Sequence, residues 1–321
     1  MVKNDCAYRG SMPNRDIIVI GGSAGSIDVL KKIVRELPSD IPAAVFVIIH
    51  LAARSRNFVP EILQKATSML VVQASEGAPI RRGTIYVAPA DRHLVIGKDH
   101  IHLSRGPNEG LQRPSINFAF RSAAAAYGPR AIGVLLSGML DDGAAGIWEI
   151  ARREGVTIVQ DPSEVQFPSM PLSALNDAVV HYTLTVAEIA PTLTRLINQE
   201  IAPGLRGREV DPREMSRFTG FTCPECRGPL YDNDHPGEFR CRVGHVMSIQ
   251  TLFEEDTSTQ ERKMYEAIVA LQEGADLAER MAGMASSADQ EQLPREAEQL
   301  RSSAEVIRKL IEGRPTAPAD R

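Results

Sequence analysis

Short apolar runs alternate with amphipathic stretches from residue 16 to about residue 199. Residues 17–20 and 44–49 are continuous apolar runs with the length of buried strands, and the segment between them carries apolar residues at helical spacing as far as Pro38. Because such strands are separated by helices, they predict an α/β fold: a doubly wound, mostly parallel sheet in a Rossmann-like three-layer arrangement. Similar runs predict strands at 84–88, 93–96, 101–103, 132–136 and 157–159, and helices at 27–37, 58–63, 115–127, 143–154 and 186–197.

The pattern changes after residue 200. Proline, glycine and many charges then follow one another, which is typical of a linker. A compact Cys/His segment comes next, followed by two stretches with apolar residues on one helical face, 257–285 and 294–311. We therefore expect a disordered tail over 1–14, the α/β domain over 15–200, a linker over 201–220, a Cys/His module over 221–250, a helical hairpin over 251–312 and a disordered tail over 313–321.

Composition narrows the class of protein. The 321 residues include 36 basic and 41 acidic side chains, a formal net charge of −5, which disfavours a general nucleic-acid binder. The first 15 residues hold no apolar run, and no segment reaches the ~18 apolar residues of a membrane span. We expect a cytoplasmic protein without membrane insertion, in which the four cysteines form no disulfides.

The turn after the first strand carries the first candidate chemistry. Residues 21–25 read Gly-Gly-Ser-Ala-Gly, which fits the G-x-S-x-G pattern of a nucleophile elbow and exposes the Ser23 hydroxyl at a strand-to-helix turn. Glycine-rich turns also bind phosphates or dinucleotides, or are simply tight. The dinucleotide pattern fails because Ser23 occupies the place of its second glycine. A nucleotide-binding module is thus a distant alternative.

Polar residues follow two other predicted strands at the same edge of the sheet. His50 ends the strand at 44–49, and Asp141 and Asp142 follow the strand at 132–136. The carboxyl ends of parallel strands gather ligand sites, so Ser23, His50 and an aspartate are expected to meet there. Histidine would accept the serine proton and the carboxylate would orient the imidazole. Each residue also has a structural alternative: His50 as a packed or capped histidine, and either aspartate as a helix N-cap.

The other histidines look structural. His93, His100 and His102 alternate with apolar residues in a predicted hairpin, so we expect exposed strand positions for them. His181 is expected at a surface edge.

Several short motifs follow one another along this domain: Ile20–Gly25, His50-Leu51, Glu76-Gly77, Ile85–Pro89, Arg113–Ser115 and Leu136–Gly146. Taken in order, they resemble the catalytic domain of CheB, the chemotaxis protein-glutamate methylesterase, over about residues 16–197. The resemblance implies that Ser23 is the nucleophile, His50 the base and Asp142, directly before the glycine of a Gly-Met-x-x-Asp-Gly loop, the triad aspartate. It implies the Met139 backbone amide as an oxyanion donor, and the elbow geometry adds that of Ala24. It further implies that catalysis needs no cofactor.

The resemblance implies hydrolysis of glutamate methyl esters, and deamidation of some glutamines, on chemoreceptors or other methylated proteins, with a CheR-type methyltransferase as a possible partner.

The sequence departs from the family pattern in three places. The sequence begins directly with the catalytic domain, so we expect no receiver domain and no control by phosphorylation within the chain. The family segment His-Arg-Pro-Ser-Val-Asp has Gln112 and Asn117 at its ends here, and residues 52–56 lack the usual proline. The altered segment motivates an alternative, a non-enzymatic scaffold that binds a receptor or methyltransferase.

The Cys/His segment has the spacing of a metal site. Cys223 and Cys226 form one C-x2-C pair, and Cys241 and His245 follow 14 residues later as C-x3-H. Three thiolates and one imidazole suit a closed, structural, tetrahedral Zn²⁺ in a zinc-ribbon-like module. Residues 221–245 hold three basic and four acidic side chains, which disfavours phosphate binding. With the helices that follow, the segment resembles the C-terminal extension of stand-alone CheB-like proteins, which indicates protein interaction or a homo-oligomer through the C-terminal helices.

Overall fold

The computed structural model describes residues 14–50, 57–201, 218–284 and 289–313. All of the expected tails except residues 14 and 313, most of the expected linker and the segment at 52–56 lie outside the described residues. Contacts divide the chain into two compact units, Met1–Thr251 and Leu252–Arg321, which we treat separately.

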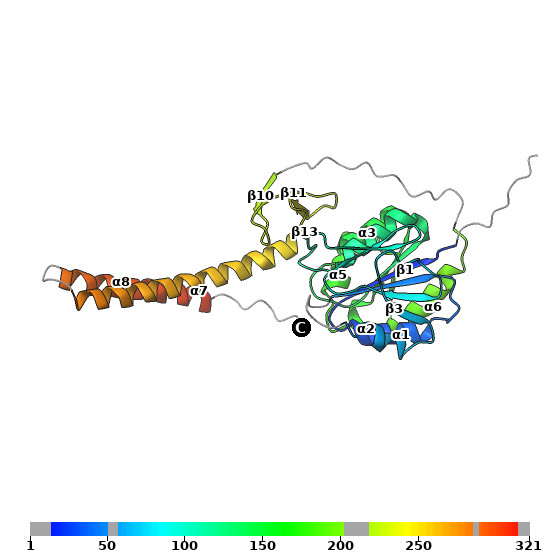
Figure 1. Cartoon of the computed structure of the whole chain (residues 1–321), viewed down its shortest axis with the longest axis horizontal. Coiled ribbons are helices and arrows are strands. Elements are labelled where there is room, and N and C mark those ends of the chain that lie inside the picture. Colours follow the sequence, from blue (N-terminus) through cyan, green and yellow to red (C-terminus); the bar gives the residue numbers. More distant parts are fainter. Residues whose placement is uncertain (1–13, 51–56, 202–217, 285–288, 314–321) are drawn as a thin grey trace, which may run out of the picture. The chain divides into compact units, whose positions relative to one another are not determined.

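The first unit is built on a seven-stranded sheet in which every pairing is parallel (Figure 1). Its order is β3-β4-β2-β1-β7-β8-β9, so the first strand lies at the centre. The predicted α/β fold is thereby confirmed. The strands are β1 (Ile17–Gly22), β2 (Ala44–Ile49), β3 (Leu70–Gln73), β4 (Thr84–Val87), β7 (Ala131–Leu135), β8 (Val156–Gln160) and β9 (Tyr182–Leu184).

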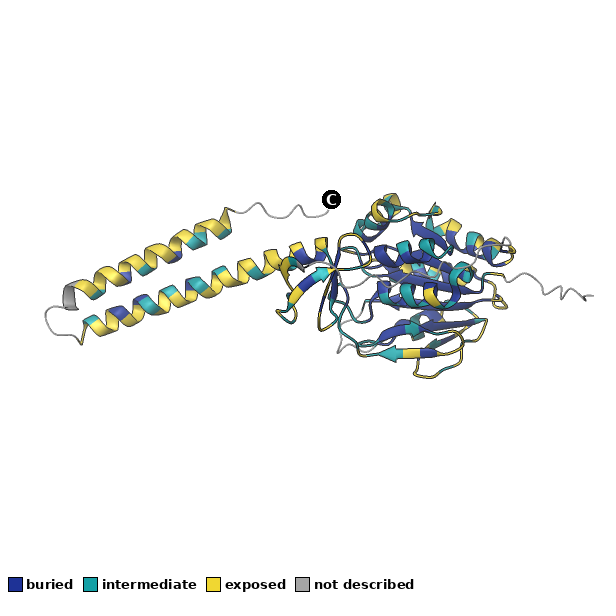
Figure 2. Ribbon diagram, turned by 90° about the horizontal axis from the view of Figure 1, so that it is seen from above, coloured by how far each residue is buried: buried dark blue, intermediate teal, exposed yellow. Residues whose placement is uncertain are grey.

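Helices cover both faces of the sheet because side chains alternate along each strand. Ile18 and Ile20 of β1 face one core cluster with α1, α2 and α6, whereas Ile17 and Val19 face a second cluster with α3, α4 and α5. In Figure 2 the central strands are accordingly buried. The helices are α1 (Ser26–Glu36), α2 (Val59–Gln64), α3 (Ile116–Tyr127), α4 (Ala144–Arg152), α5 (Ser169–Asp177) and α6 (Val186–Ile197).

Two smaller sheets complete this unit. The expected hairpin is present as β5 (His93–Ile96) and β6 (Ile101–Ser104), and it packs against α3. The Cys/His segment forms a four-stranded antiparallel sheet, β10 (Phe218–Thr222), β11 (Pro229–Asp232), β12 (Glu238–Cys241) and β13 (Val246–Ser248). We call residues 218–248 the Cys/His module.

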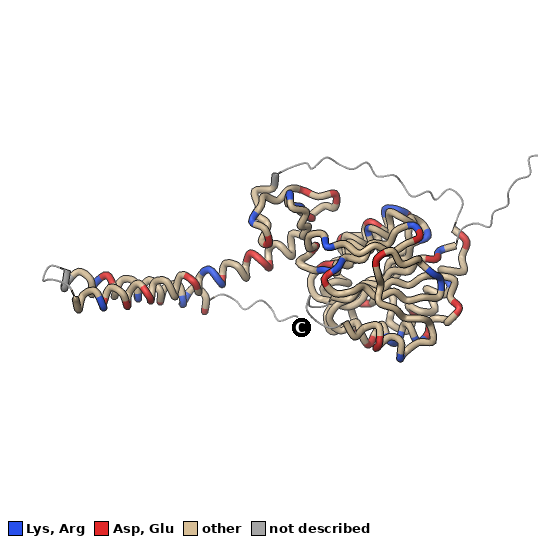
Figure 3. Tube along the Cα trace, in the orientation of Figure 1, with Lys and Arg blue, Asp and Glu red and all other residues tan. Residues whose placement is uncertain are grey.

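The second unit is a pair of long helices. Helix α7 (Ile249–Ala282) begins eight residues before the predicted start and runs from the first unit into the second, and α8 (Asp289–Glu312) begins five residues before Pro294. Small buried side chains, Ala275, Ala278 and Ala297, form their seam. Acidic and basic residues are interspersed along both helices (Figure 3). No helix in the described part of the chain is long and apolar enough to cross a membrane.

Candidate active site

Ser23 lies directly after β1, at the carboxyl end of the central strand. The strand runs two residues further than predicted, through Gly21 and Gly22, and the turn closes when the Ser26 amide and hydroxyl donate to the Ser23 carbonyl, the hydroxyl at 2.6 Å. Gly25 caps α1 with φ of 78°, a conformation that favours glycine. The Ser23 amide donates to the Ser137 carbonyl at 2.9 Å. The serine is thus held between the loops that follow β1 and β7.

His50 lies between Ser23 and Asp142. Its Nδ1 is 3.2 Å from the Ser23 Oγ and its Nε2 is 2.8 Å from the Asp142 Oδ2. A carboxylate accepts the Nε2 proton, which leaves Nδ1 as the basic nitrogen facing the hydroxyl. The structure therefore brings the three predicted residues together, with His50 between Ser23 and Asp142, as a triad would require.

The Asp142 carboxylate is buried but well supplied with donors. Its Oδ2 also accepts the Ile116 amide at 2.7 Å, and its Oδ1 accepts the Asn117 amide at 2.9 Å and the Ser115 hydroxyl at 3.0 Å. Burial opposes ionisation, but the hydrogen bond and charge of His50 and these backbone amides outweigh it, so the pKa of Asp142 is lowered. The acid consequently stays ionised beside the imidazole.

Three donors to Asp142 come from the start of α3, which the sequence did not link to the site. Ser115 is the N-cap of this helix and accepts the Phe118 amide, while the first two helical amides point at Asp142. A helix N-terminus with free amides is an anion-binding place. Ser115, the first residue of the predicted helix at 115–127, was the signal that could have identified this N-terminus, because serine is a preferred N-cap.

Asn117 joins this site through its side chain as well. The Oδ1 atom accepts the amides of Gly143 and Gly146 at 2.9 and 2.7 Å, which satisfies two donors at the start of α4. Asp142 lies just before these residues. Asn117 stands where the family segment has aspartate. Its side chain therefore fixes the loop that carries Asp142.

The predicted oxyanion donors lie in tight turns beside Ser23. Within the described part of the chain, the amides of Ala24 and Met139 have no hydrogen-bond partner. A Cβ on Gly138 would lie 2.9 Å from the Ser23 Cβ and 2.0 Å from the Met170 Sδ, so the loop before Met139 runs close to the nucleophile. This closeness suits an oxyanion role for both amides, which stays a prediction.

His93 is not exposed, contrary to expectation. It is fully buried, stacked on Phe118 with ring centroids 4.4 Å apart, because α3 covers this face of the hairpin. Its Nε2 donates to the Pro107 carbonyl at 2.9 Å and its Nδ1 accepts the Ser115 amide at 3.3 Å. Burial lowers the pKa of His93, which favours the neutral ring that this pairing needs. The expected exposure of His100, His102 and His181 is confirmed.

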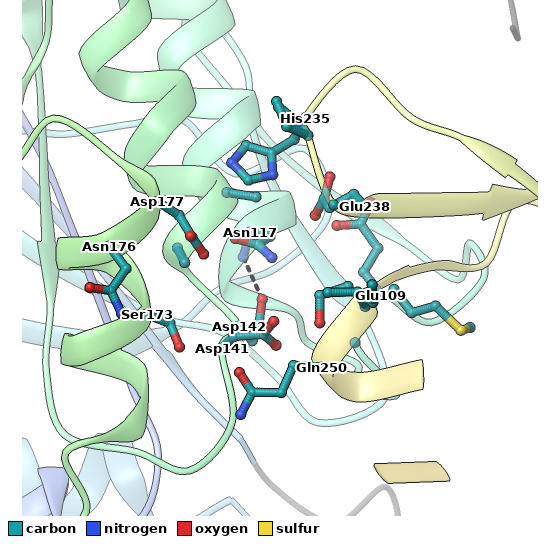
Figure 4. Close-up of a pocket in the computed structure, with 18 residues that line it drawn as sticks. Glu109, Asn117, Asp141, Asp142, Ser173, Asn176, Asp177, His235, Glu238 and Gln250 are labelled. Carbon is teal, nitrogen blue, oxygen red and sulfur yellow. Dashed lines mark hydrogen bonds between the residues drawn. The ribbon is translucent and has the colours of Figure 1, made fainter. Parts of the chain in front are cut away.

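A pocket of about 280 Å³ lies behind Asp142 (Figure 4). Its lining includes Asp141, Asp142 and Asn117 together with Glu238 and His235 of the Cys/His module, but neither Ser23 nor His50. The pocket is thus on the acid side of the triad. Asp141 accepts a hydrogen bond from Thr251 at 3.2 Å, and burial raises the pKa of Asp141 to about 6.

The Cys/His module brings its four candidate ligands together. The ligand atoms of Cys223, Cys226, Cys241 and His245 all lie within 4.8 Å of one another. The His245 Nδ1 is 3.4 Å from the Cys241 Sγ, and the Cys226 and Cys241 sulfurs are 3.6 Å apart. Tetrahedral Zn²⁺ with bonds of roughly 2.0–2.3 Å needs ligand separations of about 3.5–3.8 Å, so these residues fit the ion.

Comparisons with known proteins identify relatives of the α/β domain. Residues 18–193 match the CheB methylesterase family. A Leptospira interrogans protein, provisionally named protein-glutamate methylesterase/protein-glutamine glutaminase, is 37% identical over 184 residues, 57% of this chain and 95% of that one. The protein-glutamate methylesterase/protein-glutamine glutaminase 2 of Methanosarcina mazei is 34% identical over 57% of this chain, which spans only 52% of that relative.

A solved structure shares the fold. The crystal structure of the Thermotoga maritima CheB methylesterase catalytic domain superposes with a TM-score of 0.55 and 28% identity, covering 57% of this chain and 98% of that one. The parallel α/β sheet and its likeness to methylesterases place this protein among hydrolases. The chain belongs to the CheB methylesterase family.

Proposed function

We propose that this protein is a protein-glutamate methylesterase that uses Ser23, His50 and Asp142 as a catalytic triad, in chemotaxis or related signalling in the cytoplasm. The names of its relatives support the reaction. The single observation that carries the residue assignment is the alignment of Ser23 Oγ, both His50 nitrogens and the Asp142 carboxylate at 3.2 and 2.8 Å.

The reaction begins with attack of the Ser23 Oγ on the side-chain carbonyl carbon of a glutamate methyl ester. His50 Nδ1 takes the hydroxyl proton, and Asp142 stabilises the imidazolium that forms. The tetrahedral oxyanion is held by the amides of Ala24 and Met139, which contribute on the order of 3 kcal/mol each. Collapse of the intermediate breaks the ester C–O bond, and methanol leaves with the proton from His50.

Water completes the cycle. His50 removes a proton from the water as it attacks the acyl-enzyme, the Ser23 ester breaks, and Ser23 recovers its proton while the glutamate carboxylate departs. With a glutamine substrate, ammonia leaves in the first step and the second is identical. The substrates we propose are methylated chemoreceptors or similar proteins, with a CheR-type methyltransferase as the enzyme that supplies the ester.

The Cys/His module is proposed to hold a structural Zn²⁺ through Cys223, Cys226, Cys241 and His245. All four tetrahedral positions would be filled by protein, so the ion would stabilise the small sheet and take no part in the ester chemistry. For the helical hairpin we propose self-association, supported by exposed apolar residues on α7 such as Tyr265, Val269 and Leu277.

The test is release of labelled methanol from receptor membranes carrying methyl-labelled glutamates. We expect the wild-type chain to release methanol and Ser23→Ala to release none while retaining its circular dichroism spectrum. Asn198→Ala, an exposed change at the C-cap of α6 and far along the chain from these residues, serves as the matched control. Equal release by wild type and Ser23→Ala would instead favour the scaffold alternative.

A further inference from the structure

The Cys/His module makes several polar contacts with residues 107–110, a few residues before the helix α3 that contacts Asp142. The carboxylate of Glu225, within the Cys-Pro-Glu-Cys knuckle, lies 3.5 Å from the Nε2 of His245 and accepts the Asn108 side-chain amide at 2.9 Å. Histidines that bind a metal through one nitrogen usually donate the other to a carboxylate or carbonyl that fixes the ring. Glu225 thus joins the predicted metal site to residue 108.

Backbone contacts strengthen this junction. The Gly110 amide donates to the Val246 carbonyl at 2.8 Å, and the Val246 amide donates to the Asn108 carbonyl at 3.3 Å. Gly244 packs so closely on Pro107 that a Cβ would lie 3.2 Å from the proline ring. Residues 107–110 are therefore held along the edge of β13. This strand begins at Val246, directly after the candidate ligand His245.

The segment 107–110 continues to the triad through buried groups. The Pro107 carbonyl accepts the His93 Nε2 proton, the His93 Nδ1 accepts the Ser115 amide, and the Ser115 hydroxyl donates to Asp142. These three contacts measure 2.9, 3.3 and 3.0 Å. His93 and Ser115 are both fully buried, so water does not compete for these bonds.

A second connection runs through α3. Arg121 pairs with Glu109 and, at 3.1 Å, with Glu238 of β12, and both carboxylates are buried. Arg121 is one helical turn beyond Asn117, whose amide holds Asp142. The planar guanidinium suits two carboxylates at once, and lysine does not replace it geometrically. The Cys/His module is therefore bound through an ion pair to α3, the helix whose N-terminal amides donate to Asp142.

We propose that Asn108 and Arg121 are positioning residues through which the metal-loaded Cys/His module holds Asp142 in its catalytic orientation. This inference rests on the proposed triad and the proposed metal site. Loss of the metal frees Glu225 and β12, loosens residues 107–110 and the start of α3, and leaves Asp142 less firmly placed toward His50.

The experiment uses the full-length chain in five forms: zinc-loaded wild type, chelator-treated wild type, Asn108→Ala, Arg121→Lys and the control Asn198→Ala. Zinc content is measured by mass spectrometry for each. Hydrogen exchange of peptides covering residues 112–120 follows the amides of Ile116 and Asn117, which donate to Asp142. The rate at which a fluorophosphonate labels Ser23 reports triad chemistry, since Ser23 attacks phosphorus, fluoride leaves and His50 takes the proton.

We expect zinc removal and Asn108→Ala to raise exchange at residues 112–120 and to lower the labelling rate on the order of 10-fold, with a changed pH profile. Asn108→Ala should keep its zinc, because Asn108 is not a ligand, and Asn198→Ala should match wild type. Arg121→Lys keeps the positive charge but loses the planar guanidinium that pairs with two carboxylates. It should likewise raise exchange at residues 112–120 and lower the labelling rate.

The following results would count against the positioning role of the module. Unchanged exchange and labelling in the metal-free protein, or in both Asn108→Ala and Arg121→Lys, would overturn it, as would a wild-type chain that binds no zinc. Failure of wild type to label or to release methanol would refute the proposed function instead, while the exchange measurements would still decide whether the module holds residues 112–120.

Discussion

At the scale of single residues, two neighbouring aspartates have opposite electrostatic surroundings. Asp142 has four hydrogen-bond donors and a lowered pKa, whereas Asp141 has fewer partners and a pKa raised by burial to about 6. The neighbouring charge of Asp142 adds to the rise. One carboxylate is therefore kept ionised beside His50, while its neighbour resists ionisation.

Asp141→Asn should stabilise the protein only at higher pH. The folded state holds the Asp141 proton up to about pH 6, while the unfolded chain releases it near 3.8, so ionised Asp141 reduces stability increasingly as pH rises through this window. Asparagine removes that cost and still accepts the Thr251 hydroxyl. We expect a gain of about 1–2 kcal/mol in unfolding free energy at pH 8 and almost none at pH 4.

Denaturant unfolding at the two pH values checks this expectation. Asp40→Asn, at an exposed turn, is the matched control and should give no gain at either pH. An equal gain for Asp141→Asn at pH 4 and pH 8 would mean that the carboxylate charge is not the cause.

At the scale of elements, the N-termini of three helices lie at the candidate site. Helix α1 follows Ser23, the first amides of α3 hold Asp142, and α4 starts two residues after Asp142. Asn117 connects the last two helices, because its backbone amide binds Asp142 and its side-chain oxygen binds two amides of the α4 turn. Its amide oxygen thus serves the site structurally.

Asn117→Ala should lower stability by about 1–3 kcal/mol, since two buried donors lose their acceptor. It should also slow Ser23 labelling, because the loop before α4 carries Asp142. Asn117→Asp keeps an acceptor oxygen at a helix N-terminus, where negative charge is favourable, and should recover most of the stability. Denaturant unfolding and labelling rates measure both effects; an equal loss in the two variants would show that the acceptor is not what matters.

At the scale of the whole molecule, the Cys/His module is too small to be stable by its apolar core alone. Its buried apolar residues are few, Leu230, Phe239, Val246 and Met247 among them. A sheet of about 30 residues with so little core commonly depends on a metal. His235 of the module meets the edge of Trp148 on α4, with ring centroids 5.1 Å apart, and this is the only tryptophan in the sequence.

Trp148 fluorescence should therefore report metal loss. We expect a chelator to shift the emission to longer wavelength as His235 leaves the indole and water enters, and added Zn²⁺ to restore it. Cys226→Ser should show the shifted spectrum from the start and no further response to chelator. An unchanged wild-type spectrum after measured removal of the metal would contradict the dependence of the module on its ion.

Much of this fold could be predicted because the central strands are continuous apolar runs. The edges were harder: β3 has an exposed Leu70, β9 has three residues, and α5 contains Pro171, so their patterns are weak. The position of Ser23, His50 and Asp142 after three neighbouring strands followed from topology. The burial of His93 and the role of Asn117 did not, because both depend on how α3 packs across the sheet, which no local pattern contains.

The placement of the three triad residues along the chain also has a consequence for folding order. Ser23 and His50 are 27 residues apart and flank one β1–α1–β2 crossover, whereas Asp142 follows β7, 92 residues after His50. Short loops close sooner than long ones, and chains fold from the N-terminus during synthesis. A nascent chain would pair nucleophile and base before the acid exists to select the imidazole tautomer. With the proposed triad, esterase activity would then require that β7 has already joined the sheet beside β1.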